Sequence, residues 1–263
     1  MSLMFIVKLG GSVITDKKKK NHFRRNIMDR LSSEIKKSDH EMIIVHGAGS
    51  FGHILAKKYR LNEGYKNRDQ LKGFVLTHAS VQDLNSKVIK SLQDKGLLSV
   101  SIPPHAILQL DKHRLTSFNY AVFSAYLKHG FLPVTFGDVV LDRKLVFSIC
   151  SGDLLMQALA TSLKPEKAIF VIDEDGLYTS NPKDDPNASF IESITINELK
   201  HLTVSDNRYA DVTEGMRGKI NTIQSIARSG VDTILVNGNQ PQRLYDILSG
   251  RETVCTYIKA KKI

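Results

Sequence analysis

Two short apolar segments of this chain each run directly into a stretch rich in glycine. Residues 5–9 end at Gly10 and Gly11, and residues 42–45 run into His-Gly-Ala-Gly-Ser-Phe-Gly-His at 46–53. An apolar run of this length that stops at glycine is typical of a buried strand followed by a tight turn. Because glycine has no Cβ, backbone N–H groups in such turns can approach an anion closely. The two segments therefore predict two anion-binding turns, each placed after a strand.

The rest of the sequence continues this alternation of short apolar segments and longer amphipathic ones. We predict further strands near 98–102, 132–136, 168–172, 233–236 and 253–258, and helices near 27–37, 119–129, 153–163, 216–229 and 242–248. Residues 70–95 fit one long helix or two, and residues 139–147 fit a hairpin. This order predicts an α/β fold with a largely parallel sheet covered on both faces. We expect one domain over residues 4–263 and interpret residues 1–3 as an expression remnant.

The charge of the chain is compatible with several kinds of partner. There are 37 Lys and Arg residues against 27 Asp and Glu residues, so the formal net charge is +10. Such an excess suits nucleic acid, an anionic membrane or phosphorylated small molecules. The sequence lacks a zinc-binding spacing and an RRM-like aromatic signature, which disfavours nucleic acid, and no apolar run approaches the roughly 18 residues of a membrane span. The two cysteines are far apart in the sequence; they could form one disulfide, but nothing in the sequence demands it, and we expect a reducing, cytoplasmic setting.

The glycine patterns also exclude two common nucleotide folds. The second stretch contains Gly-x-Gly-x-x-Gly, but a dinucleotide fold needs a following strand that ends in an acidic residue. Residues 61–71 indicate loop and helix instead, and the Walker pattern of P-loop enzymes is absent. A third candidate anion site lies at 213–219, where Gly215 precedes Lys219 at the start of a predicted helix.

Five segments, taken in order, resemble the amino acid kinase superfamily over essentially the whole chain. They are Lys-x-Gly-Gly-Ser at 8–12, the 46–53 segment, Ser-Gly-Asp at 151–153, Asp-x-Asp-Gly-Leu-Tyr at 173–178 and Thr-x-Gly-Met-x-x-Lys at 213–219. Within that superfamily, the combination of Lys8, Lys17 and His53 is similar to that of the isopentenyl phosphate kinases. Glu214 is a departure, since many relatives have glycine there, and Lys18 is an alternative to Lys17 in the tetralysine run.

The resemblance implies a three-layer αβα sandwich with a mostly parallel central sheet. Its N-terminal lobe would bind a phosphorylated acceptor, and its C-terminal lobe would bind ATP with Mg²⁺. The implied reaction is phosphorylation of isopentenyl phosphate to isopentenyl diphosphate in isoprenoid biosynthesis, by a homodimer with no nucleic-acid or membrane partner. The alternatives are a related kinase acting on UMP or forming an acyl phosphate, and a non-catalytic or nucleic-acid-binding protein.

The resemblance also implies roles for individual residues. The catalytic group would comprise Lys8, Lys17, His53, Asp153 and Lys219. In this group Lys17 would stabilise charge on the transferred phosphoryl group, and Asp153 would orient two lysines. The acceptor phosphate is expected at Ala48, Gly49, His53 and Gly152. ATP is expected at Lys8, Leu9, Gly10, Gly11, Ser12, Gly49, Asp173, Tyr178, Gly215 and Lys219, with Lys183 as a weaker candidate and no protein ligand for a metal.

The hydrocarbon tail of such an acceptor would also need a pocket. Phe74, His78 and Val81 share one face of a predicted helix by their spacing, and Tyr65 precedes that helix. These side chains either line the tail pocket or pack in the core.

Overall fold

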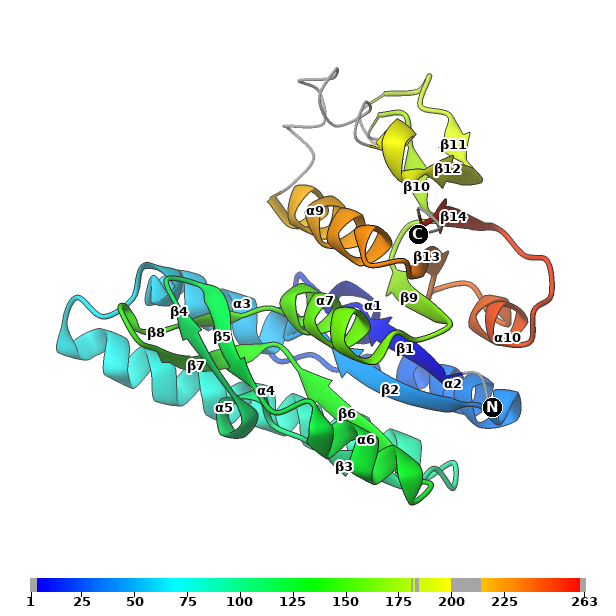
Figure 1. Ribbon diagram of the computed structural model, residues 1–263. Helices are drawn as coiled ribbons and strands as arrows, with labels where there is room; N and C mark the ends of the chain where they lie inside the picture. Colours follow the sequence, from blue (N-terminus) through cyan, green and yellow to red (C-terminus); the bar gives the residue numbers. More distant parts are fainter. Residues whose placement is uncertain (1–3, 181, 183–184, 200–213, 261–263) are drawn as a thin grey trace.

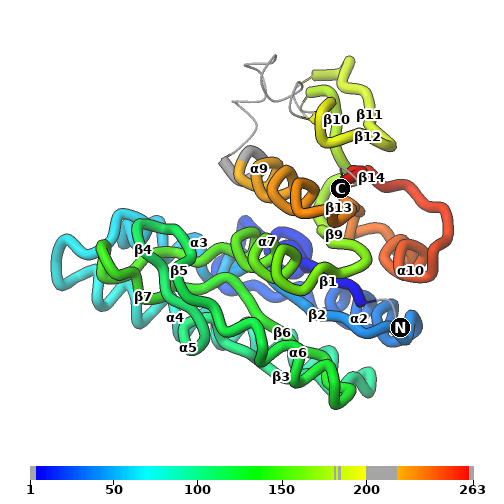
Figure 2. The backbone as a smooth tube through the Cα atoms, in the orientation of Figure 1, coloured from blue at the N-terminus to red at the C-terminus, as the bar shows by residue number. Residues whose placement is uncertain are grey.

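The computed structural model describes residues 4–180, 182, 185–199 and 214–260. A large sheet holds β1 (Met4–Leu9), β2 (Glu41–His46), β3 (Ser99–Ser101), β6 (Leu132–Phe136), β9 (Lys167–Ile172), β12 (Ser193–Thr195), β13 (Asp232–Asn237) and β14 (Cys255–Lys259). Its strand order is β12-β14-β13-β9-β1-β2-β6-β3, and only the pair β13–β14 is antiparallel. The first strand of the chain therefore lies in the middle of the sheet, between β2 and β9 (Figure 2).

Helices cover both faces of this sheet (Figure 1). One face carries α1 (Gly11–Ile14), α2 (Arg25–Ser38), α3 (Gly49–Lys58), α4 (Arg68–Gln93) and α10 (Arg243–Leu248), and the other carries α6 (Ala121–Lys128), α7 (Gly152–Leu163) and α9 (Glu214–Arg228). Successive side chains of β1 alternate between the two faces, so Ile6 enters one core while Phe5 and Val7 enter the other. Each fully buried aliphatic or Phe side chain contributes about 1.5–3 kcal/mol. The structure thus confirms the predicted three-layer fold with a mostly parallel sheet.

The region predicted as one long helix or two is the single helix α4, which begins at a well-formed cap. The Asn67 side chain accepts the N–H of Asp69, and Gln70 completes a capping box. A short 3₁₀ helix, η1 (Leu61–Glu63), precedes it. Among the described residues, no helix has the length and apolar character needed to cross a bilayer.

A second sheet lies at the end of the molecule that carries α3 and α4 (Figure 1). It consists of β5 (Arg114–Phe118), β4 (Leu108–Asp111), β7 (Asp138–Asp142) and β8 (Val146–Cys150), in that order, with α5 (Pro104–Ile107) leading into β4. The predicted hairpin at 139–147 corresponds to β7 and β8. At the opposite end, β10 (Leu177–Tyr178) pairs with β11 (Phe190–Ile191).

The hairpin formed by β4 and β5 was not expected from the sequence. Its turn places Lys112 and His113 at positive φ, 48° and 66°, where glycine is the usual residue. Asp142 stabilises this turn, because its two carboxylate oxygens accept the N–H groups of Lys112 at 3.0 Å and of His113 at 2.9 Å. The same carboxylate also accepts hydrogen bonds from Lys144, Leu145 and Ser148.

Candidate functional site

The two glycine turns follow neighbouring strands and touch each other through their backbones. The turn after β1 leads into α1, and the turn after β2 leads into α3. A Cβ on Gly11 would lie only 2.5 Å from the backbone nitrogen of Gly49, so this crossing requires a residue without a side chain. Gly49 also has a φ of +50°, which favours glycine. The predicted anion-binding turns therefore form one continuous surface at the carboxyl ends of β1 and β2.

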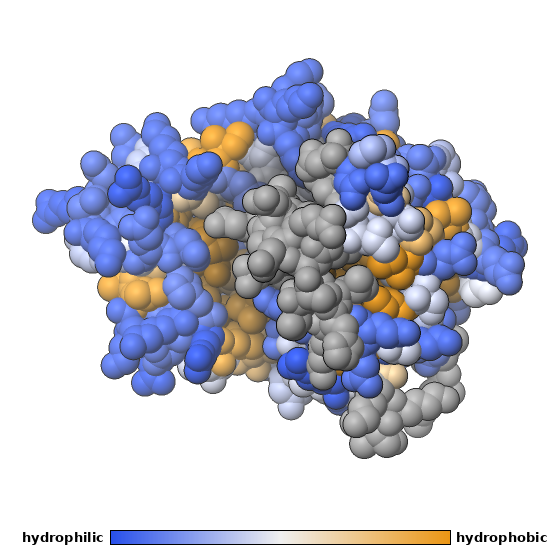
Figure 3. Space-filling view, turned by 90° about the horizontal axis from the view of Figure 1, so that it is seen from above, coloured by the Kyte–Doolittle hydropathy of each residue, from blue (hydrophilic) through white to orange (hydrophobic). Residues whose placement is uncertain are grey.

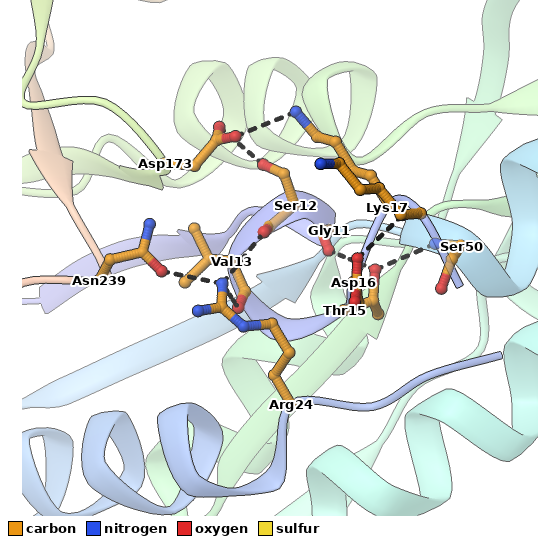
Figure 4. Close-up of polar contacts among 11 residues, drawn as sticks. Gly11, Ser12, Val13, Thr15, Asp16, Lys17, Arg24, Ser50, Asp173 and Asn239 are labelled. Carbon is orange, nitrogen blue, oxygen red and sulfur yellow. Dashed lines mark hydrogen bonds and ion pairs between the residues drawn. The ribbon is translucent and has the colours of Figure 1, made fainter. Parts of the chain in front are cut away.

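A buried hydroxyl joins these turns. Thr15 is fully buried, and its Oγ1 donates to the carbonyl oxygen of Gly11 at 2.6 Å while it accepts the N–H of Ser50 at 3.0 Å (Figure 4). It thus bridges the end of α1 to the start of α3. Sequence reasoning missed Thr15, because a threonine four residues after a glycine is no motif by itself.

A buried group of two lysines and one aspartate lies behind the glycine turns. Lys8 Nζ lies 2.6 Å from Asp153 Oδ1, and Lys219 Nζ lies 3.5 Å from the same oxygen. Asp153 stands in the first turn of α7, whose N-cap Ser151 accepts the N–H of Leu154 at 3.1 Å. Since two ammonium groups share one carboxylate, the group carries a net positive charge. The structure brings these three predicted residues together.

The surroundings perturb the pKa of both buried partners. Burial, followed by repulsion from Lys219, lowers the pKa of Lys8 to about 8, although Asp153 opposes this change. Burial works to raise the pKa of Asp153, but the two ammonium groups outweigh it and hold that pKa below its ordinary value. The carboxylate is therefore ionised at neutral pH and serves as an anchor for both lysines.

Lys17 lies on the other side of the first turn and has a different partner. Its Nζ lies 3.0 Å from Asp173 Oδ2, and the hydroxyl of Ser12 donates to Asp173 Oδ1 at 2.8 Å (Figure 4). The Lys17 side chain is 66% exposed. Lys18 is exposed too and, unlike Lys17, is not among the residues that line the cavity described next. This geometry favours Lys17 over Lys18.

A cavity of about 460 Å³ connects these groups. The lining includes Lys8, Gly10, Gly11, Ser12, Lys17, Asp173 and Lys219, together with Ala48, Gly49, His53 and Gly152. Because Gly11 lies against Gly49 and Gly52 lies against both Ala48 and Val81, the second turn stands between the first turn and α4. Beyond them the wall becomes largely apolar, with Ile54, Ala56, Thr77, Val81 and Ile149, and Asp138 is the one acid there among the described residues. In Figure 3, hydrophobic side chains show between hydrophilic ones over the end that carries α3 and β8. The cavity thus joins a cationic end to an apolar end.

His53 lies between these two ends. Although its side chain reaches solvent, desolvation by the surrounding cavity wall and the nearby charges of Lys8 and Lys17 lower its pKa, while Asp153 opposes them. The imidazole is therefore predominantly neutral at pH 7, so it can donate one hydrogen bond without requiring a positive charge.

Two of the predicted residues, Leu9 and Tyr178, do not line this cavity. Leu9 is buried in the core of the sheet, and Tyr178 packs on Phe190 in the β10–β11 pair, at 5.4 Å between ring centroids. Gly215 lies near the start of α9, and Lys183 lies outside the described residues. Neither Leu9 nor Tyr178 is among the described residues that line the cavity.

Of the residues proposed to bind a hydrocarbon tail, one lines the cavity and the others make contacts elsewhere. Val81 lines the apolar end. Phe74 and Tyr65 instead pack on Phe147, with ring centroids at 5.4 and 6.3 Å. His78 Nδ1 lies within hydrogen-bond distance of Asp138 Oδ2, at 2.8 Å. Sequence reasoning missed Asp138, which no motif marks, and it missed Thr77 and Ile149 on the same wall.

Comparison with known proteins gives a consistent set of relatives. A model of the amino acid kinase family matches residues 4–237. The isopentenyl phosphate kinase of Methanothermobacter thermautotrophicus is 39% identical, with 98% of this chain and 100% of that protein covered, and that of Thermoplasma acidophilum is 34% identical, with 95% and 97% covered.

Solved structures agree with these relatives. An isopentenyl phosphate kinase structure superposes with a TM-score of 0.86 at 36% identity, covering 97% of this chain and 100% of that one. A substrate complex of an isopentenyl phosphate kinase superposes with a TM-score of 0.83 at 32% identity, with the same coverage. A UMP kinase from Ureaplasma parvum, at 15% identity and a TM-score of 0.65, shares the fold alone.

Proposed function

Because the chain belongs to the amino acid kinase family, we propose that it transfers the γ-phosphoryl group of ATP to isopentenyl phosphate. The observation that carries the proposal is the cavity itself. It joins a cationic end, anchored by Lys8, Asp153 and Lys219, to an apolar end of suitable character for a short hydrocarbon. The full-length relatives named for this activity support the choice of acceptor.

The reaction needs electrostatic help more than it needs a base. A phosphate monoester is largely dianionic near neutral pH, since its second pKa is about 6. One of its oxygens attacks the γ-phosphorus, the bond from that phosphorus to the β–γ bridging oxygen breaks, and ADP leaves with that oxygen. The difficulty is that two anions must meet, so fixed cations and N–H donors should carry the catalysis.

The residues of the cavity fit this requirement. Lys8 and the amides of Gly10, Gly11 and Ser12 would hold β- and γ-phosphate oxygens, and Lys219 would hold them from the opposite side. Asp153 would orient the two lysines, as its short contacts suggest. Lys17 would leave Asp173 and stabilise charge on the transferred group, since its exposed side chain is free to move.

The acceptor phosphate would lie in the middle of the cavity. Ala48, Gly49, His53 and Gly152 line this part, where backbone N–H groups of the second turn and the neutral His53 would act as donors. Asp173, Tyr178 and Gly215 would serve the nucleotide, Tyr178 from outside the cavity. The tail would then extend past Thr77 and Val81.

Mg²⁺ is expected to bind with the nucleotide rather than in a protein cage. The carboxylates at the cationic end are already partnered, Asp153 with two lysines and Asp173 with Lys17 and Ser12. The ion would be held mainly by phosphate oxygens and water. When bound, it would offset part of the phosphate charge.

We also propose that the protein acts as a homodimer in the cytoplasm, in isoprenoid biosynthesis. Leu71, Val75 and Leu76 of α4 are 45%, 63% and 40% exposed, an apolar surface that a second copy would cover. Both cysteines are free thiols, which suits a reducing compartment. Sedimentation of the wild-type chain and of Val75→Glu measures the first point, and a monomer in both would contradict it.

The decisive experiment is ATP consumption against isopentenyl phosphate, UMP, N-acetylglutamate and carbamate side by side. We expect turnover with isopentenyl phosphate to exceed that with each other acceptor by more than about 10²-fold in kcat/KM. Isopentenyl diphosphate should be the isolated product. Preferred turnover of another acceptor would replace the proposed substrate, and no turnover of any acceptor would favour a non-catalytic protein.

A further inference from the structure

Three side chains from three elements converge behind the apolar end of the cavity. They are His78 of α4, His105 of α5 and Asp138 at the start of β7. His78 Nδ1 lies 2.8 Å from Asp138 Oδ2, and His105 Nδ1 lies 3.8 Å from the same oxygen. The three donor atoms all lie within 4.8 Å of one another. No sequence motif includes these residues and the proposed phosphoryl transfer does not use them, although its spacing in the sequence makes His78 a candidate for the tail pocket.

The carboxylate of the cluster is fixed in place before any ligand arrives. Asp138 is only 3% exposed. Its Oδ1 accepts the N–H of Val139 at 2.8 Å, so Oδ2 is directed at the two imidazoles. A buried acid with one oxygen already bound to the backbone has little freedom to turn away. This makes Oδ2 a pre-positioned acceptor.

Both histidines present Nδ1 to the same oxygen of Asp138. Their rings are nearly perpendicular, at 88°, with centroids 4.6 Å apart. His78 is stacked on Phe74 at 21° and 6.4 Å. His105 stands in the first turn of α5, directly after Pro103 and Pro104, whose rings restrict the backbone there. The cluster is therefore built from constrained parts of the chain.

We propose that His78, His105 and Asp138 bind a divalent transition-metal ion of the Zn²⁺ class. Two imidazole nitrogens and one carboxylate oxygen form a ligand set that Zn²⁺ accepts and that Mg²⁺, which prefers oxygen ligands, does not. Bonds of about 2.0–2.2 Å in a tetrahedral arrangement place donor atoms about 3.3–3.6 Å apart. The two observed N–O distances, 2.8 and 3.8 Å, bracket this spacing, and the two imidazole nitrogens lie within 4.8 Å of each other, so side-chain shifts that draw the three donor atoms together admit the ion.

Three protein ligands leave one coordination position open. Asp138 is part of the cavity wall, and His78 and His105 are partly exposed, so an ion can reach the site and keep a water molecule as its fourth ligand. The site shares no residue with the group of Lys8, Asp153 and Lys219 that would serve the phosphates. It is therefore distinct from a Mg²⁺ ion that arrives with ATP, and the proposal does not depend on the kinase reaction.

Calorimetric titration of the metal-stripped full chain with ZnCl₂, in excess Mg²⁺, tests the proposal directly. We expect one Zn²⁺ per chain, and we expect His105→Ala or His78→Ala to weaken binding by more than about 100-fold. His129→Ala removes an exposed histidine at the end of α6 and should leave binding unchanged. His53→Ala should also leave it unchanged, because that residue lies in the middle of the cavity.

Two further measurements guard against misfolding and non-specific binding. Co²⁺ in place of Zn²⁺ should give the intense visible absorption of a four-coordinate site in the wild type but not in His105→Ala. Zn²⁺ should likewise raise the thermal unfolding midpoint of the wild type and His129→Ala, but not that of His105→Ala. If His105→Ala and His78→Ala bind Zn²⁺ with the wild-type affinity and stoichiometry, the cluster is only a hydrogen-bonded His–Asp pair and the proposal is wrong.

Discussion

Lys8 and Lys17 reach the same cavity from either side of one glycine turn, but the protein holds them in opposite ways. The Lys8 side chain is 8% exposed and lies 2.6 Å from Asp153, which also holds Lys219. The Lys17 side chain is 66% exposed and pairs with Asp173 at 3.0 Å, near solvent. An exposed ion pair contributes only about 0–1 kcal/mol, so Lys17 can leave its partner at little cost.

This difference suggests that the two lysines have different roles in the reaction. A buried cation that is anchored on a carboxylate is in place before ATP binds, which suits a group that positions phosphates. A mobile cation can follow charge as it moves from one phosphate to the other. The comparison shows that a lysine in an exposed loop can have a different role from a buried lysine that lines the same cavity.

Replacing the buried lysine should have the largest effect. Lys8→Met keeps the length of the side chain but removes its charge, so we expect kcat/KM to fall on the order of 10³-fold. Steady-state kinetics with ATP and isopentenyl phosphate measure this, and the thermal unfolding midpoint checks that the variant is folded. A loss smaller than about tenfold would place Lys8 outside the reaction.

Replacing the exposed Lys17 should reduce activity less than replacing Lys8, and the loss should be in kcat rather than in KM. We expect Lys17→Ala to lower kcat by about 10²-fold with little change in either KM, because the charge is needed when the phosphoryl group moves. Lys18→Ala is the matched control from the same loop and should keep near wild-type kcat. Equal losses in the two variants would show that the loop acts through its overall charge instead.

Because the pKa of Lys8 is lowered, the contribution of Lys8 to ATP binding should depend on pH. Burial and repulsion from Lys219 lower it to about 8 against the opposing effect of Asp153, so Lys8 is mostly charged at pH 7 and mostly neutral at pH 9. We expect KM for ATP to rise by about tenfold over this range. Lys8→Arg, which stays charged, should show a flatter profile. A wild-type profile as flat as that of Lys8→Arg would contradict the prediction.

The contribution of Lys8 to the free energy of unfolding should rise with pH, whereas its contribution to ATP binding should fall. In the unfolded chain a lysine keeps its ordinary pKa of 10.5, so between about pH 8 and 10.5 the unfolded state binds more protons at this position than the folded one. The contribution of Lys8 to the free energy of unfolding therefore rises with pH. The difference in that free energy between wild type and Lys8→Met, followed by urea titration, isolates this contribution, and a difference that does not vary with pH would contradict the assigned pKa.

The smallest expected effect concerns the hydroxyl that joins the two turns. Thr15→Val keeps the shape but leaves the Ser50 N–H without its acceptor, which should lower the free energy of unfolding by about 1–3 kcal/mol. We expect only a several-fold loss of activity, and Thr15→Ser should restore most of both. A serine variant as impaired as the valine variant would show that the methyl group, not the hydroxyl, matters.

Sequence reasoning reached most of the fold because apolar periodicity is a local signal. Strands such as 132–136 and helices such as 153–163 could be placed from it, and the glycine turns predicted which strand ends carry the cavity. The hairpin at 108–118 could not be predicted, because its turn residues favour positive φ only through Asp142, which lies some 30 residues further along the chain. Local sequence propensity does not reveal contacts between residues this far apart in the chain.

The residues of the candidate site likewise fall into those that motifs predicted and those that depend on tertiary packing. Lys8, Asp153 and Lys219 were proposed from motifs, and the structure places them in contact. Thr15 and Asp138 belong to no motif, and their positions follow from how the second turn and β7 pack. The pairing of Lys17 with Asp173 depends on the path of a basic loop, which the tetralysine run leaves undetermined.

Asp142 makes the turn between β4 and β5 sensitive to acid. Burial works to raise its pKa, but the N–H donors of His113, Leu145, Lys112 and Lys144 outweigh it and hold that pKa well below its ordinary range. The stability it contributes is present above the ordinary carboxyl pKa of about 3.9 and is lost as pH falls towards the folded value. Protonating this one carboxyl would weaken its hold on the N–H groups of Lys112 and His113, so this hairpin turn, which is built without glycine, should loosen as the pH falls towards the folded value.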